Sequence, residues 1–242
     1  MSNKLAGKWT QIYYAGYDLS GWSHQFDATI EVDEIDGTAF LDGAKNSFDG
    51  LPGGSAAVEA FLSTGAGESE DGLSTYVPTY TDYHLQILVG QNAAPAIGDP
   101  VFMLTAKQFD YKVPLSVATA VLIQSTFKQQ TKPYWGTVHA NTSITNTTGF
   151  ASVDGKMVSS ANGAEATLEI ITALASDTYV IKVQHSTNDV DWVDLMTFTA
   201  DGSARTSERQ TVTGTINRYT RALATRTGSG QTLRLAVAVV RL

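Results

Sequence analysis

Acidic side chains gather in one short stretch of the chain, where Glu31, Asp33, Glu34 and Asp36 fall within six residues. Carboxylate oxygens are preferred ligands of Ca²⁺, so a calcium site is the first chemistry to consider. The stretch alternates as a strand does, which places Glu31 and Asp33 on one face and Glu34 on the other. The Asp-x-Asx-x-Asx-Gly spacing of a calcium loop is absent. The pattern therefore favours a solvated acidic face, and we expect no metal there.

A second group of carboxylates surrounds a tryptophan, because Asp189, Asp191 and Asp194 flank Trp192. One interpretation is a carbohydrate platform on which the Trp192 ring stacks against a sugar. In an alternating strand, however, Trp192 shares its face with apolar residues and only Asp194 interrupts the row, which otherwise consists of Val190, Met196 and Phe198. Core packing is the favoured interpretation, and Trp192 is kept as a candidate surface-glycan contact.

Groups for catalysis are sparse. The four histidines lie at positions 24, 84, 139 and 185, and no two have the i, i+4 spacing of a helical metal pair. The chain has no cysteine, which excludes a disulfide framework, a thiolate zinc site and a cysteine nucleophile. A Gly-x-Ser-x-Gly elbow, a phosphate-binding loop and a dinucleotide fingerprint are also missing. We expect a protein that is not an enzyme and that uses no cofactor or metal.

Composition and charge narrow the choice of partners. The chain has 242 residues, 43% of them hydrophobic, which suffices for one large or two modest domains. Its net charge of -8 and pI near 4.9 argue against a phosphate-binding surface, although an acidic wall would let DNA slide past without sticking. Ordinary solubility explains the charge equally well. The clearest apolar run, residues 235–240, is far shorter than a membrane span, so we expect a soluble, unsecreted protein without membrane insertion.

Period-2 alternation dominates the chain and predicts mostly strands. A glycine-rich turn is expected at residues 50–54 and a long loop at residues 65–80. The best helix candidate is residues 81–89, because Thr81 can cap its start and Gly90 can end it. The strand expected at 118–127 reads as buried on both faces. The other expected strands are residues 8–14, 28–32, 55–62, 100–105, 107–112, 166–172, 179–185, 192–198, 209–214, 219–224 and 233–242.

A shift to Asn, Thr, Ser and Gly between residues 140 and 164 predicts a domain boundary. We expect a first domain at residues 1–145, a linker at 146–162 and a second domain at 163–242. The evenly spaced short strands of the second part are typical of a β-sandwich.

Several short motifs occur in the order found in one protein family. Residues 18–21 read Asp-Leu-Ser-Gly, residues 36–42 read Asp-Gly-Thr-Ala-Phe-Leu-Asp, and Gly50-Leu is followed by Ser55 and by Glu59-Ala-Phe61. In this order they resemble the major tail tube proteins of long-tailed, siphovirus-type bacteriophages, with Ala60 where that family commonly has glycine. Residues 183–186 and 215–221 more weakly resemble a C-terminal extension that some such proteins carry.

The resemblance implies a mainly β protein, with an N-terminal tail-tube-like β-sandwich or barrel, one flanking α-helix and a C-terminal β-sandwich. It implies that copies close into rings, six to a ring, and that the rings stack into a tail tube through which DNA is ejected. The implied partners are further copies of the chain, tape-measure and tail-terminator proteins, and DNA in transient, non-specific passage. The implied location is the virion tail, after assembly in the host cytoplasm.

Two sets of residues are candidates for assembly and DNA passage. The loop at residues 65–80 is expected to reach neighbouring subunits, with contacts from Glu68, Glu70, Asp71, Tyr76 and Tyr80. Glu31 and Asp33 are expected to form an acidic face of the lumen. The alternatives are a carbohydrate-binding or adhesin module and a capsid decoration protein, with a hydrolase the least favoured.

Overall fold

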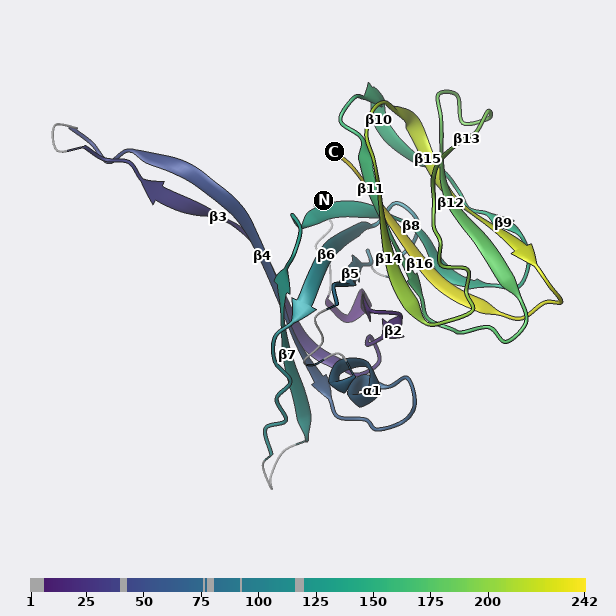
Figure 1. The fold of residues 1–242 in the computed structure, drawn as a ribbon, viewed down its shortest axis with the longest axis horizontal. Helices are drawn as coiled ribbons and strands as arrows, with labels where there is room; N and C mark the ends of the chain where they lie inside the picture. Colours follow the sequence, from purple (N-terminus) through teal and green to yellow (C-terminus); the bar gives the residue numbers. More distant parts are fainter. Residues whose placement is uncertain (1–6, 40–42, 76, 78–80, 92, 116–119) are drawn as a thin grey trace.

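The computed structural model describes residues 7–39, 43–75, 77, 81–91, 93–115 and 120–242. The chain is mainly β, and every ladder between its named strands is antiparallel (Figure 1). Within the described ranges, no helix is long and apolar enough to cross a membrane. The elements are η1 (Gly7–Trp9), β1 (Thr10–Tyr14), β2 (Tyr17–Asp18), β3 (Ser23–Asp36), β4 (Ser47–Phe61), α1 (Ser69–Ser74), β5 (Tyr83–Val89), β6 (Pro100–Gln108), β7 (Leu122–Gln129), β8 (Tyr134–Ile144), β9 (Thr148–Gly149), β10 (Val153–Ser160), β11 (Ala164–Ile170), β12 (Thr178–Ser186), β13 (Val193–Thr197), β14 (Thr206–Val212), β15 (Ile216–Thr227) and β16 (Leu233–Arg241).

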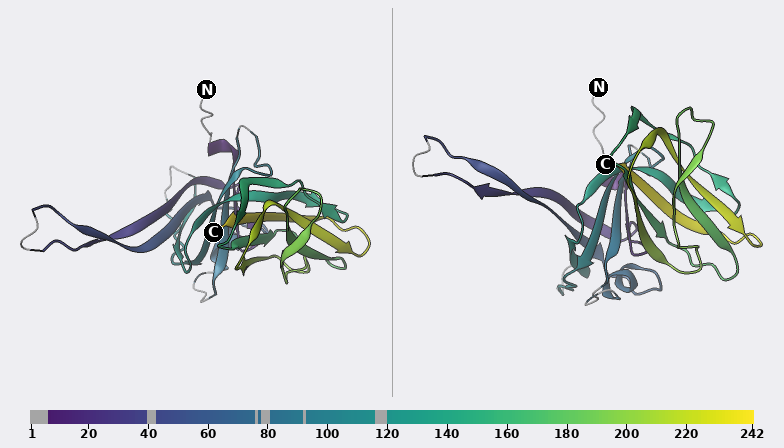
Figure 2. Two further views of the ribbon diagram at one scale, coloured as in Figure 1. Left: turned by 90° about the horizontal axis from the view of Figure 1, so that it is seen from above. Right: turned by 45° about the horizontal axis from the view of Figure 1, so that its top comes forward.

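A large sheet of 11 strands organises the molecule. Its main path runs β14-β11-β16-β8-β6-β5-β1-β2, and β7 branches from β6 to join β4 and then β3. The sheet curls so that β14 and β11 approach β5, which lies elsewhere in the same path (Figures 1 and 2). One apolar cluster fills the space inside this curl, from Tyr13, Leu88, Val101, Met103, Val138, Ala236 and Ala238. The fold is therefore barrel-like where the first and last strands meet.

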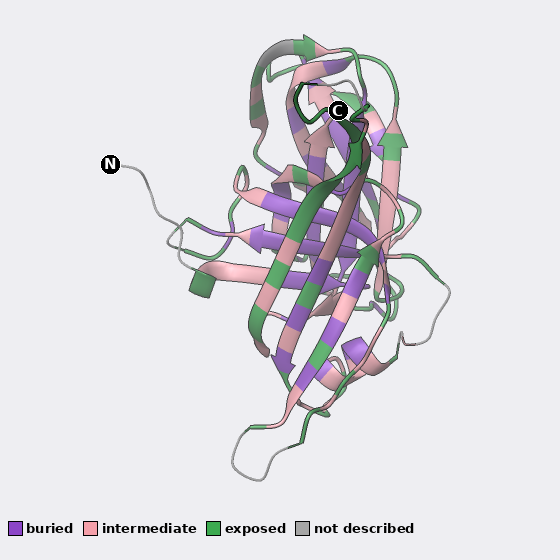
Figure 3. Ribbon diagram, turned by 90° about the vertical axis from the view of Figure 1, so that its left-hand side faces the viewer, coloured by how far each residue is buried: buried purple, intermediate pink, exposed green. Residues whose placement is uncertain are grey.

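A second sheet of five strands covers the C-terminal end. Its path is β10-β15-β12-β13, with β9 paired to β15. It packs against the large sheet around a core drawn from both sheets, including Leu168, Ile181, Ala224 and Val237. This is sandwich packing, in which alternate residues of each strand point inward. Figure 3 shows the alternation between buried and exposed residues along single strands.

The helix prediction was wrong in its position. Residues 83–89 form the central strand β5, which is paired with β1 on one side and β6 on the other. Five consecutive residues of β5 are buried, so the strand shows no alternation that would distinguish it from a buried helix. The α-helix found among the described residues is α1, inside the segment that was expected to be a loop. Its Ser69, Gly72 and Leu73 are buried against the body.

Other expectations differ from the structure in extent. The glycine-rich turn expected at residues 50–54 is part of β4. Strand β7 alternates between buried and exposed residues and is not covered on both faces. The segment expected as a linker contains β9 and most of its second half is β10. Strands that precede residues 146–162 in the chain and strands that follow them both belong to the large sheet. The division into two domains stays a prediction.

Candidate assembly surface

The outer part of the β3–β4 hairpin is a two-stranded ribbon that leaves the body of the molecule. Strands β3 and β4 pair from Ser23↔Ala60 to Asp36↔Ser47. On its other edge, β4 pairs with β7 only over residues 55–61. We call the described residues 30–39 and 43–54 the arm. Figures 1 and 2 show the arm projecting to one side, away from both sheets, in all views.

The arm exposes a set of large apolar side chains. A two-stranded hairpin is at best marginally stable alone in water, and exposed apolar side chains on such a ribbon are unusual for an isolated monomer. The register places Ile35 directly opposite Phe48 and Val32 opposite Pro52. The exposed fractions are 42% for Ile30, 53% for Val32, 54% for Ile35, 57% for Phe48 and 82% for Leu51.

The arm also carries the acidic cluster. Both Glu31 and Asp33, predicted to line a lumen, are exposed on β3. The ladder has an irregularity between Val32 and Glu34, so the regular alternation used to assign faces is interrupted there. Beyond this irregularity, Glu34 lies directly opposite Asp49, and two like charges in this position repel each other. The ion pair between Lys45 and Glu34, at 3.1 Å, offsets part of this repulsion. The lumen assignment of Glu31 and Asp33 stays a prediction.

The predicted inter-subunit loop is partly held by its own chain. Glu68 accepts hydrogen bonds from the Ser63 hydroxyl and, at 2.9 Å, from the Gly65 N–H, and these bonds lower its pKa. Asp71 accepts from the Gly67 N–H at 2.7 Å, and the N–H of Glu70 donates to the Ser63 carbonyl at 3.0 Å. The side chains of Glu68 and Asp71 and the backbone of Glu70 therefore hold the segment that leads into α1. Their role in subunit contacts stays a prediction, and Tyr76 and Tyr80 lie outside the described residues.

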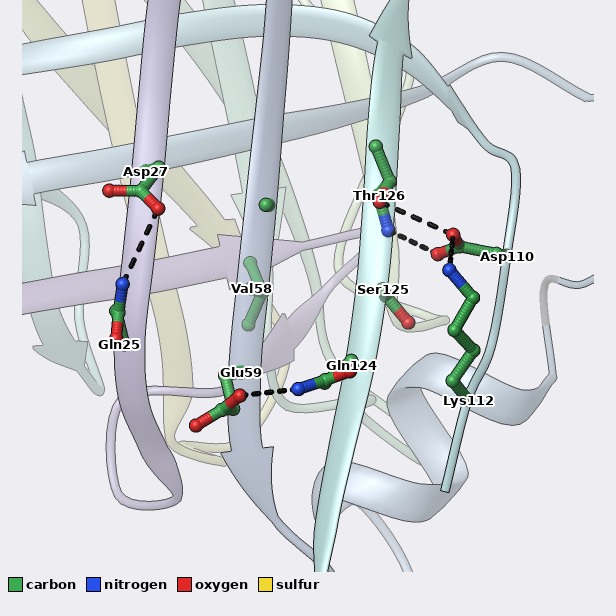
Figure 4. A pocket seen from close by; sticks show the side chains of 10 residues that line it. Gln25, Asp27, Val58, Glu59, Asp110, Lys112, Gln124, Ser125 and Thr126 are labelled. Atoms are coloured by element: carbon green, nitrogen blue, oxygen red, sulfur yellow. Dashed lines mark hydrogen bonds and ion pairs between the residues drawn. The ribbon is translucent and has the colours of Figure 1, made fainter. Parts of the chain in front are cut away.

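A polar groove lies between β3, β4 and β7 (Figure 4). Glu59 accepts a hydrogen bond from Gln124 at 2.6 Å, and Asp110 forms an ion pair with Lys112 at 2.9 Å. Asp27 also lines the groove, which leaves three carboxylates against one lysine among its lining residues. The groove is thus negatively charged and its polar groups are largely paired with one another.

A second groove, which we call the basic groove, lies where β8, β10 and β16 meet and has a volume of about 310 Å³. Trp135, 54% exposed, forms one wall and packs edge-on against Phe102 with ring centroids 5.5 Å apart. His139 is buried beneath it, and burial lowers the pKa of His139 to about 4, so the imidazole is neutral at pH 7. The charge of the groove comes from Lys156 and Arg241.

Neither Lys156 nor Arg241 forms an ion pair with a carboxylate among the described residues. Arg241 donates to the carbonyls of Ile216 at 2.8 Å and Arg218 at 3.3 Å. The one acid of the groove, Asp154, is paired with Arg218 at 2.7 Å, an interaction that lowers the pKa of Asp154 to about 2. The lining therefore holds two cations and one carboxylate, and that carboxylate is already paired with Arg218.

Trp192 does not close the core. It is half-buried and takes no part in the apolar cluster between the sheets, whereas Met196 and Phe198 do. The Arg221 guanidinium lies over the Trp192 ring at 4.2 Å from its centroid and covers one face. The predicted sharing of a buried face with Val190 is wrong, because Val190 is 74% exposed. A glycan contact at Trp192 stays a prediction.

Polar side chains join the two ends of the large sheet where it curls onto itself. Gln86 of β5 donates from Nε2 to the Thr167 hydroxyl of β11 at 2.9 Å. Glu169 of β11 is fully buried and accepts the N–H of Gly16 at 2.7 Å. Its second oxygen, Oε1, has no hydrogen-bond partner among the described residues. Burial raises the pKa of Glu169 well above its usual value of 4.5, although the bond from Gly16 lowers it.

The wild-type protein should lose stability as pH rises because Glu169 is buried. The Glu169→Gln variant should not show this loss. The unfolded chain ionises this group near its usual pKa of 4.5, while the folded chain keeps the proton to higher pH. The stabilisation is therefore complete below pH 4.5 and is lost above it, by up to about 1.4 kcal/mol per pH unit until the folded pKa is reached. Urea denaturation of wild type and Glu169→Gln across this range measures the difference.

Glu208 supplies a matched control for this measurement. Burial raises the pKa of Glu208, but its hydrogen bonds, including those from the Thr199 and Ala200 N–H groups, together outweigh burial and lower the pKa. The contribution of Glu208 to stability is therefore lost as pH falls. Glu208→Gln should change the pH dependence with the opposite sign. Parallel curves for wild type and Glu169→Gln would contradict the assignment of a neutral buried carboxyl.

No group of three or more His, Asp or Glu side chains that could hold a metal ion occurs among the residues that the structure describes. His84, which sequence left unassigned, is buried with Nδ1 at 3.0 Å from the Thr105 hydroxyl, and burial lowers its pKa to about 4. Neither the arm nor the basic groove was predicted from the sequence. The sequence signal for the arm is the run of apolar residues among the acids of β3 and β4, and the basic groove has no such signal because its residues are far apart in the chain.

Comparison with known proteins gives weak likenesses. No protein-family model matches the chain, and no curated protein sequence matches it. A chain described as "Virion of native gene transfer agent (GTA) particle" is similar at a TM-score of 0.42 and 8% identity, over 55% of this chain and 98% of that one. A chain of "Structure of infectious bursal disease virus Gx strain" is similar at a TM-score of 0.26 and 10% identity, over 98% of this chain and 68% of that one. Likenesses at these values carry no argument about what this chain does.

Proposed function

We propose that this chain is a structural virion protein whose copies join into rings, six to a ring, and that the rings stack into a tail tube for DNA ejection. The observation that carries the proposal is the arm. Its large apolar side chains are exposed, and outside residues 55–61 the ribbon of β3 and β4 pairs with no third strand among the described residues. A second copy of the chain would cover these side chains.

The position of the arm favours an open or ring-shaped assembly. It projects from one side of the molecule (Figure 1), and docking of the arm on the body of a neighbour would join two different surfaces. A contact between two different surfaces is heterologous, and it repeats from copy to copy until it closes a ring or continues along a stack. Many copies of one modest contact then hold a long assembly together.

Charge supports the passage of DNA through such an assembly. With a net charge of -8, the chain repels phosphate and would not retain a duplex. The ends of the tube would contact tape-measure and tail-terminator proteins, and the chain would be located in the virion tail after assembly in the host cytoplasm. Nothing in this role requires catalysis or a cofactor.

Electron microscopy of the purified chain at increasing concentration tests the proposal. We expect rings or tubes with a hollow centre. Dispersed monomers at every concentration would contradict it. Assembly only on preformed capsid shells would identify a capsid decoration protein instead.

A further inference from the structure

We infer that the arm of one copy docks into the basic groove of a neighbouring copy. The inference rests on the proposed self-assembly and names the two surfaces that form the contact. The arm supplies exposed apolar side chains together with carboxylates. The basic groove supplies an exposed tryptophan, apolar walls and unpaired cations.

Charge complementarity is the first argument. The arm carries five carboxylates, Glu31, Asp33, Glu34, Asp36 and Asp49, against the single cation of Lys45. The basic groove presents the cations of Lys156 and Arg241 against Asp154, and Asp154 is already paired with Arg218. Cations next to Glu34 and Asp49 would relieve the repulsion between these two directly opposed carboxylates. Opposite charges of this kind set partner choice and register at interfaces.

The apolar parts also match. The basic groove is lined by Trp135, Val153, Val239 and Val240, and its volume of about 310 Å³ gives room for large side chains. Phe48 and Leu51 are the most exposed large apolar residues of the arm. Aromatic and aliphatic side chains that enter such a pocket contribute most of the binding energy at protein interfaces.

The other grooves fit the arm less well. The groove in Figure 4 is lined by Asp27, Glu59 and Asp110 and would repel it. A groove near β14 is lined by Asp201 and Glu208 without any cation. In a third groove, the cation of Arg205 already lies over the Tyr17 ring at 5.3 Å and is balanced by the carboxylate of Asp18.

The contact must form between copies. The arm points away from the body of the molecule, to which β8, β10 and β16 belong (Figures 1 and 2). Its attachment to the large sheet through the β4–β7 ladder fixes that direction. The arm therefore cannot fold back into the basic groove of its own chain.

Site-directed crosslinking tests the inference, because the chain has no cysteine of its own. Chains with Ser47→Cys in the arm are mixed with chains carrying Val153→Cys in the basic groove, assembled, and treated with a short bismaleimide. Any product of two chains joined through these positions is intermolecular. We expect an abundant heterodimer that depends on assembly. The matched control replaces Val153→Cys by Ser203→Cys, an exposed serine in the acidic groove near β14, and should give little product.

The outcomes separate the two proposals. Assembled particles that give no Ser47–Val153 product, or as much product with Ser203→Cys, would overturn the docking inference and leave the assembly proposal intact. Failure of every mixture to form particles would overturn both. Particle formation is followed by electron microscopy in the same samples.

Charge reversal provides a second readout. Lys156 has a φ of 58°, a left-handed conformation that aspartate tolerates, so Lys156→Asp suits the backbone. We expect Lys156→Asp and Asp49→Lys each to weaken assembly by roughly tenfold, and the double variant to recover most of the loss. Additive losses in the double variant would contradict a direct contact.

Discussion

Assembly should be lost when Phe48 and Leu51 are both replaced by serine. Each side chain is more than half exposed in the monomer, at 57% and 82%, so the free energy of unfolding should change little. Burial of each in a neighbouring copy contributes about 1.5–3 kcal/mol, so their joint loss should weaken association by roughly 10²- to 10⁴-fold. Sedimentation velocity measures the association, and urea denaturation measures the stability of the monomer.

Val190→Ser is the matched control for this variant. Val190 is 74% exposed, but it lies between β12 and β13, outside the arm and the basic groove. It should leave both association and stability unchanged. Equal loss of association in the control and in the arm variant would show that general surface hydrophobicity drives assembly. Unchanged association in the arm variant would contradict a role for the arm.

Gly16→Ala should destabilise the monomer more than any surface replacement. Gly16 has a φ of 85° in the tight turn between β1 and β2, where the preceding Ala15 has a φ of 53°. A Cβ at Gly16 would lie 2.5 Å from the Thr206 nitrogen and 2.7 Å from the Ile170 oxygen, both backbone atoms. The left-handed backbone and the forced shift of β11 and β14 together cost about 2–5 kcal/mol.

Gly98→Ala separates the two causes. Gly98 has a φ of 92°, but no atom lies within 4 Å of an added Cβ. Its replacement should cost only about 1–2 kcal/mol, the conformational part alone. Chemical denaturation of both variants measures the difference. Equal losses would mean that the close approach of Gly16 to β11 and β14 does not contribute to stability.

Local patterns predicted the fold class and most strands but not the long-range pairing. The segments expected at residues 55–62 and 219–224 lie in β4, up to Phe61, and in β15, because one face of each strand meets the core. Residues 100–105 lie in β6, where Val101 to Ala106 are all buried. Strand β8 was not predicted. Its polar residues Asn141, Thr142 and Ser143 obtain their partners from β16, far along the chain. Pairing of this kind is decided by tertiary contacts that no local window contains.

The errors over helices have the same origin. Thr81 and Gly90 give start and stop signals around residues 83–89, yet pairing with both β1 and β6 outweighs the local preference. Helix α1 contains Gly72 and spans 6 residues, too few to be stable alone. It forms because Leu73 is buried in the core and its carbonyl accepts a bond from Gln108 at 2.8 Å.

The candidate site shows the same limit. The acids of β3 were recognised in sequence, but the apolar residues between them were read as the buried half of an ordinary strand. That the β3–β4 hairpin leaves the sheet where β4 stops pairing with β7 follows from the fold alone. The basic groove combines residues of β8, β10, β15 and β16, which are distant in sequence, so no motif could have indicated it.

Hydrogen–deuterium exchange of the arm amides, compared between monomers and assembled particles, tests the central claim most directly. In the monomer the two-stranded ribbon should open readily, so the amides of residues 30–36 and 47–54 should exchange fast. In assembled particles, docking on a neighbour should slow their exchange, while the amides of β12 and β15 in the second sheet should change little. Fast arm exchange that persists after assembly would contradict the claim that the arm joins one copy to the next.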